Sequence, residues 1–249
     1  MNRRLISAAW FSCAVMLFGC GRQSSAQSNS TNSSQAIESV SKIPAYRVGL
    51  RSIVVPSPAE LQETGPDFRV LFERLAPDSN RLVAAFIPAG DIAKLPAGSA
   101  DGLARYALLE TLRQAEFADI DETIFKQAKE LIAKQFGTTV DAPAMDTKAI
   151  QDELNHRFKE QGYTGQVSLD KPVALGVFFS KADAIGFGML MDVNSGGKTQ
   201  KMIGGMALIR SQGRLLYTYI FTHYAGDDSA AWVRTTSEQW ADAILKANP

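Results

Sequence analysis

Four extended apolar stretches, separated by short turns, fill the chain from Val173 to Tyr224. Strands are expected over 173–179, 184–193, 201–210 and 215–224, because turn residues occupy 180–183, 194–198 and 211–214. Connections this short join antiparallel neighbours. The second half of the chain is therefore predicted to form a four-stranded antiparallel meander, which needs partners on both faces of its sheet.

The second of these strands separates large side chains from small ones. Ile185, Phe187, Met189 and Met191 fall on one face, and Gly186 and Gly188 fall on the other beside Leu190. Ala174 and Gly176 are expected to continue the small face in the preceding strand. Glycine inside a strand usually marks the close approach of another backbone, so a helix is predicted to pack there.

The last segment supplies such a helix. Apolar residues recur near helical spacing after Asp227 and Asp228, either of which is expected to cap the helix. The positions concerned are Trp232, Val233, Thr236, Trp240, Ile244 and Leu245.

The first half mixes strands and helices. An extended stretch from Tyr46 to Val55 ends at two prolines, and a hairpin is predicted from strands over 68–73 and 82–87. Three helices are expected next: one from Leu103, one between Asp121 and Gly137, and one from Asp146 to Gln161. An antiparallel sheet, made of this N-terminal hairpin and the meander and layered with helices, predicts an α+β fold that ends in an amphipathic helix.

The N-terminus has the pattern of an export signal. Arg3 and Arg4 precede an apolar run from Leu5 to Phe18 that is too short to span a bilayer comfortably. Its end, Leu17-Phe18-Gly19-Cys20, resembles the lipobox of bacterial lipoproteins. The resemblance implies cleavage before Cys20 and acylation of Cys20 by fatty acyl chains such as palmitate. An ordinary signal peptide with an accidental cysteine is the alternative.

Three segments follow from this interpretation: a signal peptide over 1–19, a lipidated Cys20 with a Ser/Asn/Gln-rich tether over 20–42, and one globular domain over 43–249. The tether composition predicts a flexible chain with a reach of about 25 Å. Cys13 would leave with the signal, so no thiol would remain for a disulfide, a zinc site or a nucleophile. Gly21 stands where an aspartate resembles an inner-membrane retention signal, so a periplasm-facing position on the outer membrane is expected.

The order of elements from Tyr46 to Pro249 resembles the Mog1/PsbP-like fold, including the terminal helix with Trp240 and the extended Val54-Val55-Pro56 near the start. Members of that fold are mostly binding or assembly factors. The resemblance therefore implies a non-catalytic role with an envelope protein partner. The balance of 26 basic and 26 acidic residues gives no attraction to nucleic acid.

His223 is the best local candidate for a ligand site. It shares a strand face with Tyr217, Tyr219 and Phe221, and Asp227 follows closely. One imidazole and a carboxylate could bind a metal or a small ligand, or act in acid–base chemistry. An aromatic stripe on a strand is more often core, and the other histidine, His156, is expected to face solvent.

No catalytic or cofactor motif is found. Gly186, Gly188 and the Gly204-Gly205 pair lie inside strand patterns rather than before a helix, so they are interpreted as packing positions and not as a nucleotide loop. No cofactor is expected. The sequence leaves two hypotheses: a non-catalytic lipoprotein that binds or assembles an envelope component, and a small-ligand-binding or enzymatic domain with a cleft near His223.

Overall fold

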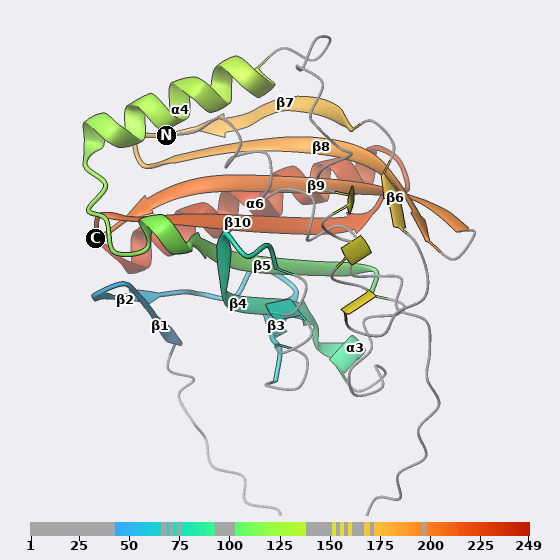
Figure 1. Cartoon of the computed structure of the whole chain (residues 1–249), viewed down its shortest axis with the longest axis horizontal. Helices are drawn as coiled ribbons and strands as arrows, with labels where there is room; N and C mark the ends of the chain where they lie inside the picture. Colours follow the sequence, from blue (N-terminus) through green and yellow to red (C-terminus); the bar gives the residue numbers. More distant parts are fainter. Residues whose placement is uncertain are drawn as a thin grey trace, which may run out of the picture.

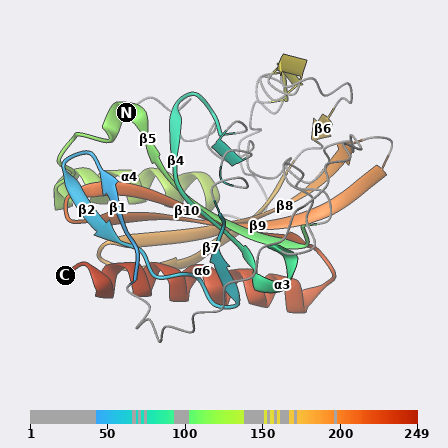
Figure 2. The ribbon, with the colours of Figure 1, turned by 90° about the horizontal axis from the view of Figure 1, so that it is seen from below.

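The computed structural model describes residues 43–65, 69, 72–73, 76–92, 103–137, 151–152, 155–156, 159–160, 167–169, 172–195 and 198–249. Within these residues the chain forms an α+β domain, in which an eight-stranded sheet is covered by a helix on each face (Figures 1 and 2).

The predicted meander is confirmed. It consists of β7 (Val173–Ser180), β8 (Ala184–Ser195), β9 (Lys198–Ser211) and β10 (Arg214–His223), each antiparallel to the next. Gln212 and Gly213 both have positive φ, 48° and 73°, in the turn between β9 and β10. That backbone is the one that a two-residue hairpin of type I′ needs, and glycine adopts it without steric cost.

The sheet extends beyond β10 through β5 (Arg105–Leu112), β4 (Asn80–Pro88) and the short β3 (Leu61–Glu63). On the other side β6 (Val167–Leu169) and β7 both pair with β8, at different points along its length. The helix predicted from Leu103 is therefore wrong. This run is buried on both faces, and a short apolar run cannot be told from a buried helix by periodicity alone.

The hairpin predicted over 68–73 and 82–87 is corrected in its first strand. The described residues Arg69, Phe72 and Glu73 are helical, and the Arg69 amide donates to the Gly65 carbonyl at 3.1 Å. The physical reason is that both edges of β4 are already occupied, one by β3 and the other by β5. The second strand is confirmed as part of β4.

A separate two-stranded hairpin replaces the single stretch expected from Tyr46 to Val55. Its strands are β1 (Ala45–Val48) and β2 (Arg51–Val54), joined by Gly49 and Leu50. Gly49 has φ of 56°, the conformation that a tight hairpin turn requires at its first central position.

The predicted helix after Asp121 is α4 (Glu122–Phe136), and it covers one face of the sheet (Figure 1). The Asp121 side chain caps it by accepting a hydrogen bond from the Ile124 amide at 2.7 Å. Ile124 and Leu131, expected in its apolar stripe, remain partly exposed. The buried side chains, which pack with the large face of β8, are Phe125, Ala128, Ile132 and Phe136.

The terminal helix α6 (Asp227–Ala247) covers the opposite face, as Figure 2 shows. Trp240 is its main anchor: the ring meets Phe86 edge-on at 5.3 Å, and Nε1 donates to the Pro56 carbonyl at 2.7 Å. The predicted cap is wrong, because Gly226 holds the cap position and Asp227 and Asp228 lie in the first turn. There their charges complement the helix dipole instead.

The small face of β8 is covered by a different element from the one that the sequence predicts. β-Carbons added to Gly186 and Gly188 would overlap the rings of Phe179 and Phe178, so β7 rather than α6 fills this space. Irregular pairing of β7 with β8 places Ala174 in the core on the α4 side. Direct approach of α6 occurs at Gly205, where an added β-carbon would lie 2.7 Å from Val233 Cγ1.

Smaller elements complete the described chain: α3 (Ala89–Ile92) after β4, and the 3₁₀ turn η1 (Arg113–Ala115) before α4. The helix predicted from Asp146 to Gln161 falls partly outside the described residues. The predicted signal peptide over 1–19, Cys20 and the tether lie wholly outside them. The described residues Gln151, Asp152, Asn155, His156, Lys159 and Glu160 are helical. Over the described residues, no helix has the length and apolar character needed to cross a bilayer.

Candidate functional site

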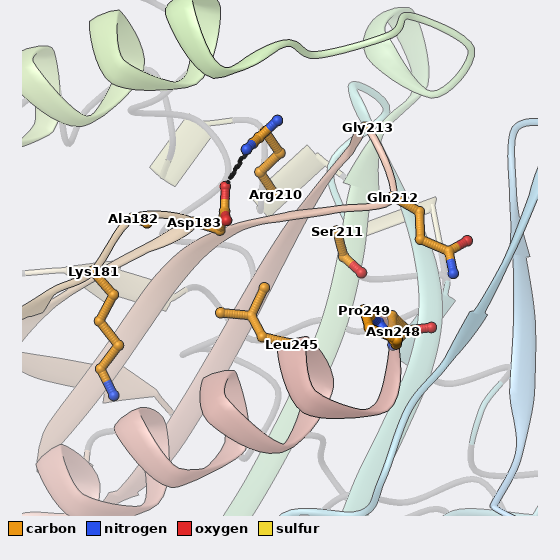
Figure 3. A pocket seen from close by; sticks show the side chains of 10 residues that line it. All are labelled: Lys181, Ala182, Asp183, Arg210, Ser211, Gln212, Gly213, Leu245, Asn248 and Pro249. Carbon is orange, nitrogen blue, oxygen red and sulfur yellow. Dashed lines mark hydrogen bonds and ion pairs between the residues drawn. The ribbon is translucent and has the colours of Figure 1, made fainter.

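A cleft lies at the end of the sheet where the β7–β8 and β9–β10 turns approach the end of α6 (Figure 3). Its volume is about 410 Å³, which is in the range of small-ligand sites. The residues that line it are Lys181, Ala182, Asp183, Arg210, Ser211, Gln212, Gly213, Leu245, Asn248 and Pro249.

The charged groups of the cleft are paired with one another or with α6. Arg210 Nη2 lies 2.5 Å from Asp183 Oδ1, and Arg210 Nε donates to the same oxygen at 2.7 Å. Lys181 Nζ lies 2.6 Å from Asp242 Oδ1 and 3.0 Å from Glu238 Oε1. Figure 3 shows Lys181 directed toward α6 and away from Arg210.

The electrostatics of Lys181 do not suit a general base. Burial tends to lower the pKa of its ammonium, but hydrogen bonds to Asp242 and Glu238 outweigh that effect and raise the pKa above its usual value. A lysine base needs a depressed pKa. Lys181 therefore remains a protonated cation that holds the β7–β8 turn to α6.

Two polar side chains that line the cleft, Asn248 and Ser211, differ in their hydrogen bonding. Asn248 is fully engaged: Nδ2 donates to the Val54 and Ile244 carbonyls, and Oδ1 accepts from the Val54 amide at 2.8 Å. The buried Ser211 Oγ makes no hydrogen bond to any residue that the structure describes. Because this hydroxyl is covered, the cleft offers mainly its turn groups to a polar ligand, and none of the residues that line it is a histidine or a cysteine.

The residues proposed from sequence around His223 are only partly brought together. Tyr217 and Tyr219 are 1% and 0% exposed and pack in the core cluster on the α4 side, with Phe221. Burial raises the pKa of Tyr217 above its usual value. His223 is half-buried at the end of the same strand, whereas Asp227 is exposed in the first turn of α6.

His223 keeps one feature of interest. Its Nε2 is buried and makes no hydrogen bond within the described chain, and burial lowers the pKa of the imidazole. The ring is therefore neutral at pH 7 and could act as an acceptor or as a metal ligand. Over the residues described, no group of three or more His, Cys, Asp or Glu side chains gathers as a metal site.

The cleft was not anticipated from the sequence, although a signal for it exists. In a four-stranded meander the first and third turns lie at the same end of the strands, so residues 180–183 and 211–214 must be neighbours. The opposite charges of Asp183 and Arg210 at these turns could then have suggested an ion pair. The end of α6 closes the cleft beside the two turns. Its position depends on how the helix crosses the sheet, and no sequence pattern predicts that.

Comparison with known proteins adds only a distant likeness of fold. No protein-family model and no curated protein matches the chain. Solved structures that align with it include a point mutant of the protein Mog1, with 13% identity over 82% of this chain and 94% of that one, at a TM-score of 0.31. They also include the Saccharomyces cerevisiae Ran-binding protein Mog1p, with 11% identity over 83% of this chain and 91% of that one, at a TM-score of 0.25. Both are weak similarities of overall structure.

Proposed function

We propose that this protein is a bacterial envelope lipoprotein, anchored through an acylated Cys20, whose domain over 43–249 binds or helps to assemble another envelope component. The observation that carries the proposal is Leu17-Phe18-Gly19-Cys20, placed after a basic start and an apolar run. A polar segment over 21–42 then leads to the folded domain, whose first described residue is Ile43.

Binding is favoured over catalysis by the chemistry of the cleft. Its charges are engaged in ion pairs, the pKa of Lys181 is raised, and Ser211 has no base among the residues that line the cleft. These groups suit recognition of a polar surface or peptide better than proton transfer.

Lipid labelling tests the anchor directly. In a bacterial host grown with a clickable fatty acid, the wild-type chain should take up label and sediment with outer-membrane fractions. Cys20→Ser should lose the label, and Cys13→Ser should keep it because Cys13 leaves with the signal. A mature chain with a free Cys20 thiol would contradict the proposal, and recovery in the inner membrane would contradict only the choice of membrane.

Crosslinking in intact cells tests the cleft as the binding surface. A photoreactive residue at Gln212, in the β9–β10 turn, should capture one discrete envelope protein. The matched control is Thr235, which is exposed in the middle of α6 and does not line the cleft. Equal capture from both positions would argue against the cleft.

A small-ligand-binding or enzymatic domain near His223 is the second candidate. It is favoured by one observation, the buried His223 Nε2 that lacks a hydrogen-bond partner among the described residues. Stoichiometric zinc or manganese in the purified protein, lost on His223→Gln without loss of folding, would move this candidate ahead of the first.

A further inference from the structure

Leu50 and Phe117 are the most exposed large apolar side chains of the described chain, at 72% and 66%. Leu50 lies in the β1–β2 turn, and Phe117 lies between η1 and α4. The two come from adjacent backbone, because Phe117 Cα is 3.3 Å from the place that a β-carbon on Gly49 would occupy. Figure 2 shows the β1–β2 turn beside the segment that leads into α4.

The backbone beneath these side chains is held from several sides. The Gly49 amide donates to Glu116 Oε1 at 3.2 Å, and Arg81 Nη2 bonds both that oxygen and the Arg47 carbonyl, at 2.7 and 2.8 Å. The buried Arg214 donates to the Ala118 carbonyl at 2.5 Å. Leu50 and Phe117 are therefore presented on a fixed support.

Three basic residues lie near the pair along the chain: Arg47 and Arg51 in the β1–β2 hairpin, and Arg113 in η1. Arg47, Arg51 and Arg113 are exposed and form no ion pair with any residue that the structure describes. The nearby carboxylates of Glu116 and Asp119 are paired with Arg81 and Arg214, at 2.7 and 3.1 Å. Asp78 is exposed in the turn before β4, next to Ser79, whose carbonyl accepts the Arg113 amide, and Asp121 and Glu122 are exposed at the start of α4. We call Leu50, Phe117, Arg47, Arg51 and Arg113 together the apolar tip.

The apolar tip lies a short length of chain after the point where the predicted tether joins the domain. From Pro44 to Leu50 the chain covers about six residues of strand, or about 20 Å. The composition of residues 21–42 predicts a reach of about 25 Å from the anchor. A lipid on Cys20 would thus keep the apolar tip within reach of the bilayer surface.

We infer that the apolar tip docks on the surface of an anionic phospholipid bilayer, with Leu50 and Phe117 entering the interface and the three arginines facing lipid phosphates. The inference rests on the proposed lipid anchor and adds an orientation to it. Apolar side chains flanked by basic ones are the pattern that binds lipid interfaces. One exposed turn gives little affinity alone, but an anchor on the same chain makes the contact intramolecular.

The test uses the acylated full-length protein in vesicles of phosphatidylcholine with or without phosphatidylglycerol. Leu50→Cys carries an environment-sensitive fluorophore, and nitroxide-labelled lipids serve as quenchers. Thr235→Cys, exposed on α6, is the matched control position. Quenching at residue 50 but not at residue 235, stronger with phosphatidylglycerol, is the expected result. Arg47→Gln and Arg51→Gln should each reduce the docked-to-free ratio about fivefold.

Phe117→Ser should weaken quenching at residue 50, whereas Val173→Ser, which removes a side chain 53% exposed elsewhere, should leave it unchanged. Equal quenching at residues 50 and 235 in an acylated protein would overturn the docking inference alone. A fluorophore shift that depends on protein density, without quenching by lipid, would overturn the docking inference. It would show that the apolar tip binds a second copy of the chain and not the bilayer. Labelling of the parent protein at Cys20 would instead show a free thiol and overturn the proposed anchor.

Discussion

Arg81 and Glu116 form a two-point ion pair that ties β4 to the segment before α4: Nη2 lies 2.7 Å from Oε1, and Nε lies 3.0 Å from Oε2. The Arg81 hydrogen bond is the main reason that the pKa of Glu116 falls below its usual value. The side chains are 28% and 14% exposed. Two parallel hydrogen bonds in a partly shielded place hold more firmly than a single contact on the open surface.

Replacing Glu116 with Gln should lower the free energy of unfolding by about 1–2 kcal/mol at pH 7. Glu73→Gln, which breaks an exposed pair with Arg69 in helical spacing, should cost less than about 0.5 kcal/mol. Chemical denaturation of the two variants beside the wild type measures the difference. Equal losses would mean that the Arg81 contact is no stronger than a surface pair.

The contribution of Glu116 should also depend on pH in a defined direction. Its pKa is lowered in the folded state, so the stabilisation is fully present above the unfolded value of about 4.3 and is lost as pH falls through the folded pKa. The gap between wild type and Glu116→Gln should stay constant at neutral pH and shrink at acidic pH. A gap that widens on acidification would contradict this assignment.

Gly49→Ala should destabilise the domain by about 1–3 kcal/mol. The residue has φ of 56°, and an added β-carbon would overlap the Glu116 carbonyl, which is backbone and cannot swing away. Gly65→Ala is the matched control, because nothing lies within 4 Å of its added β-carbon. Thermal melting of both variants checks the expectation, and a Gly49→Ala protein that melts with the wild type would refute it.

The meander, the Asp121-capped helix and the Trp240 helix could all be predicted because each depends on a pattern local to its own sequence. The failures have a common cause, which is that they depend on tertiary neighbours. Residues 106–109 are apolar without alternation, so only the place of this run between β4 and β10 makes it a strand. The turn at Gly49 depends on contact with Glu116, far along the chain.

The candidate sites divide in the same way. Tyr217 and Tyr219 share the face that their alternation predicts, but the sequence could not tell whether that face was filled or hollow. The cleft around Asp183 and Arg210 needs the end of α6 to close it. The apolar tip joins residues about 67 positions apart, which no local pattern brings together.

Two glycines of the small face should respond differently to the same substitution. Gly205→Ala meets Val233 Cγ1 at 2.7 Å and also Ser237 Oγ, both on buried positions of α6, so it should cost about 2–3 kcal/mol. Gly188→Ala meets the ring of Phe178, which is only half-buried and can turn outward, so about 1 kcal/mol is expected. Denaturant midpoints rank the two, and the reverse order would show that β7 rather than α6 is the tighter neighbour.

Removal of the Trp240 side chain should be more damaging than either glycine change. Trp240→Ala leaves a cavity beside Phe86 and also leaves the Pro56 carbonyl without its donor at 2.7 Å, so a loss of about 3–5 kcal/mol is expected. Trp232→Ala, a half-buried tryptophan of the same helix, is the control. Similar melting of the two variants would contradict the anchoring role of Trp240.

His223 offers a pH test of its role in the fold. Because burial lowers the pKa of its imidazole in the folded state, the unfolded chain takes up a proton first as pH falls below about 6.5. Its contribution to stability is therefore intact above that pH and decreases as pH falls toward the folded pKa. His223→Gln should remove this decrease and leave metal content unchanged. Melting curves across mildly acidic pH, with metal analysis of the same samples, measure both. A His223→Gln protein that keeps the full pH dependence would remove His223 as its source, and loss of bound metal would return His223 to the candidate ligand site.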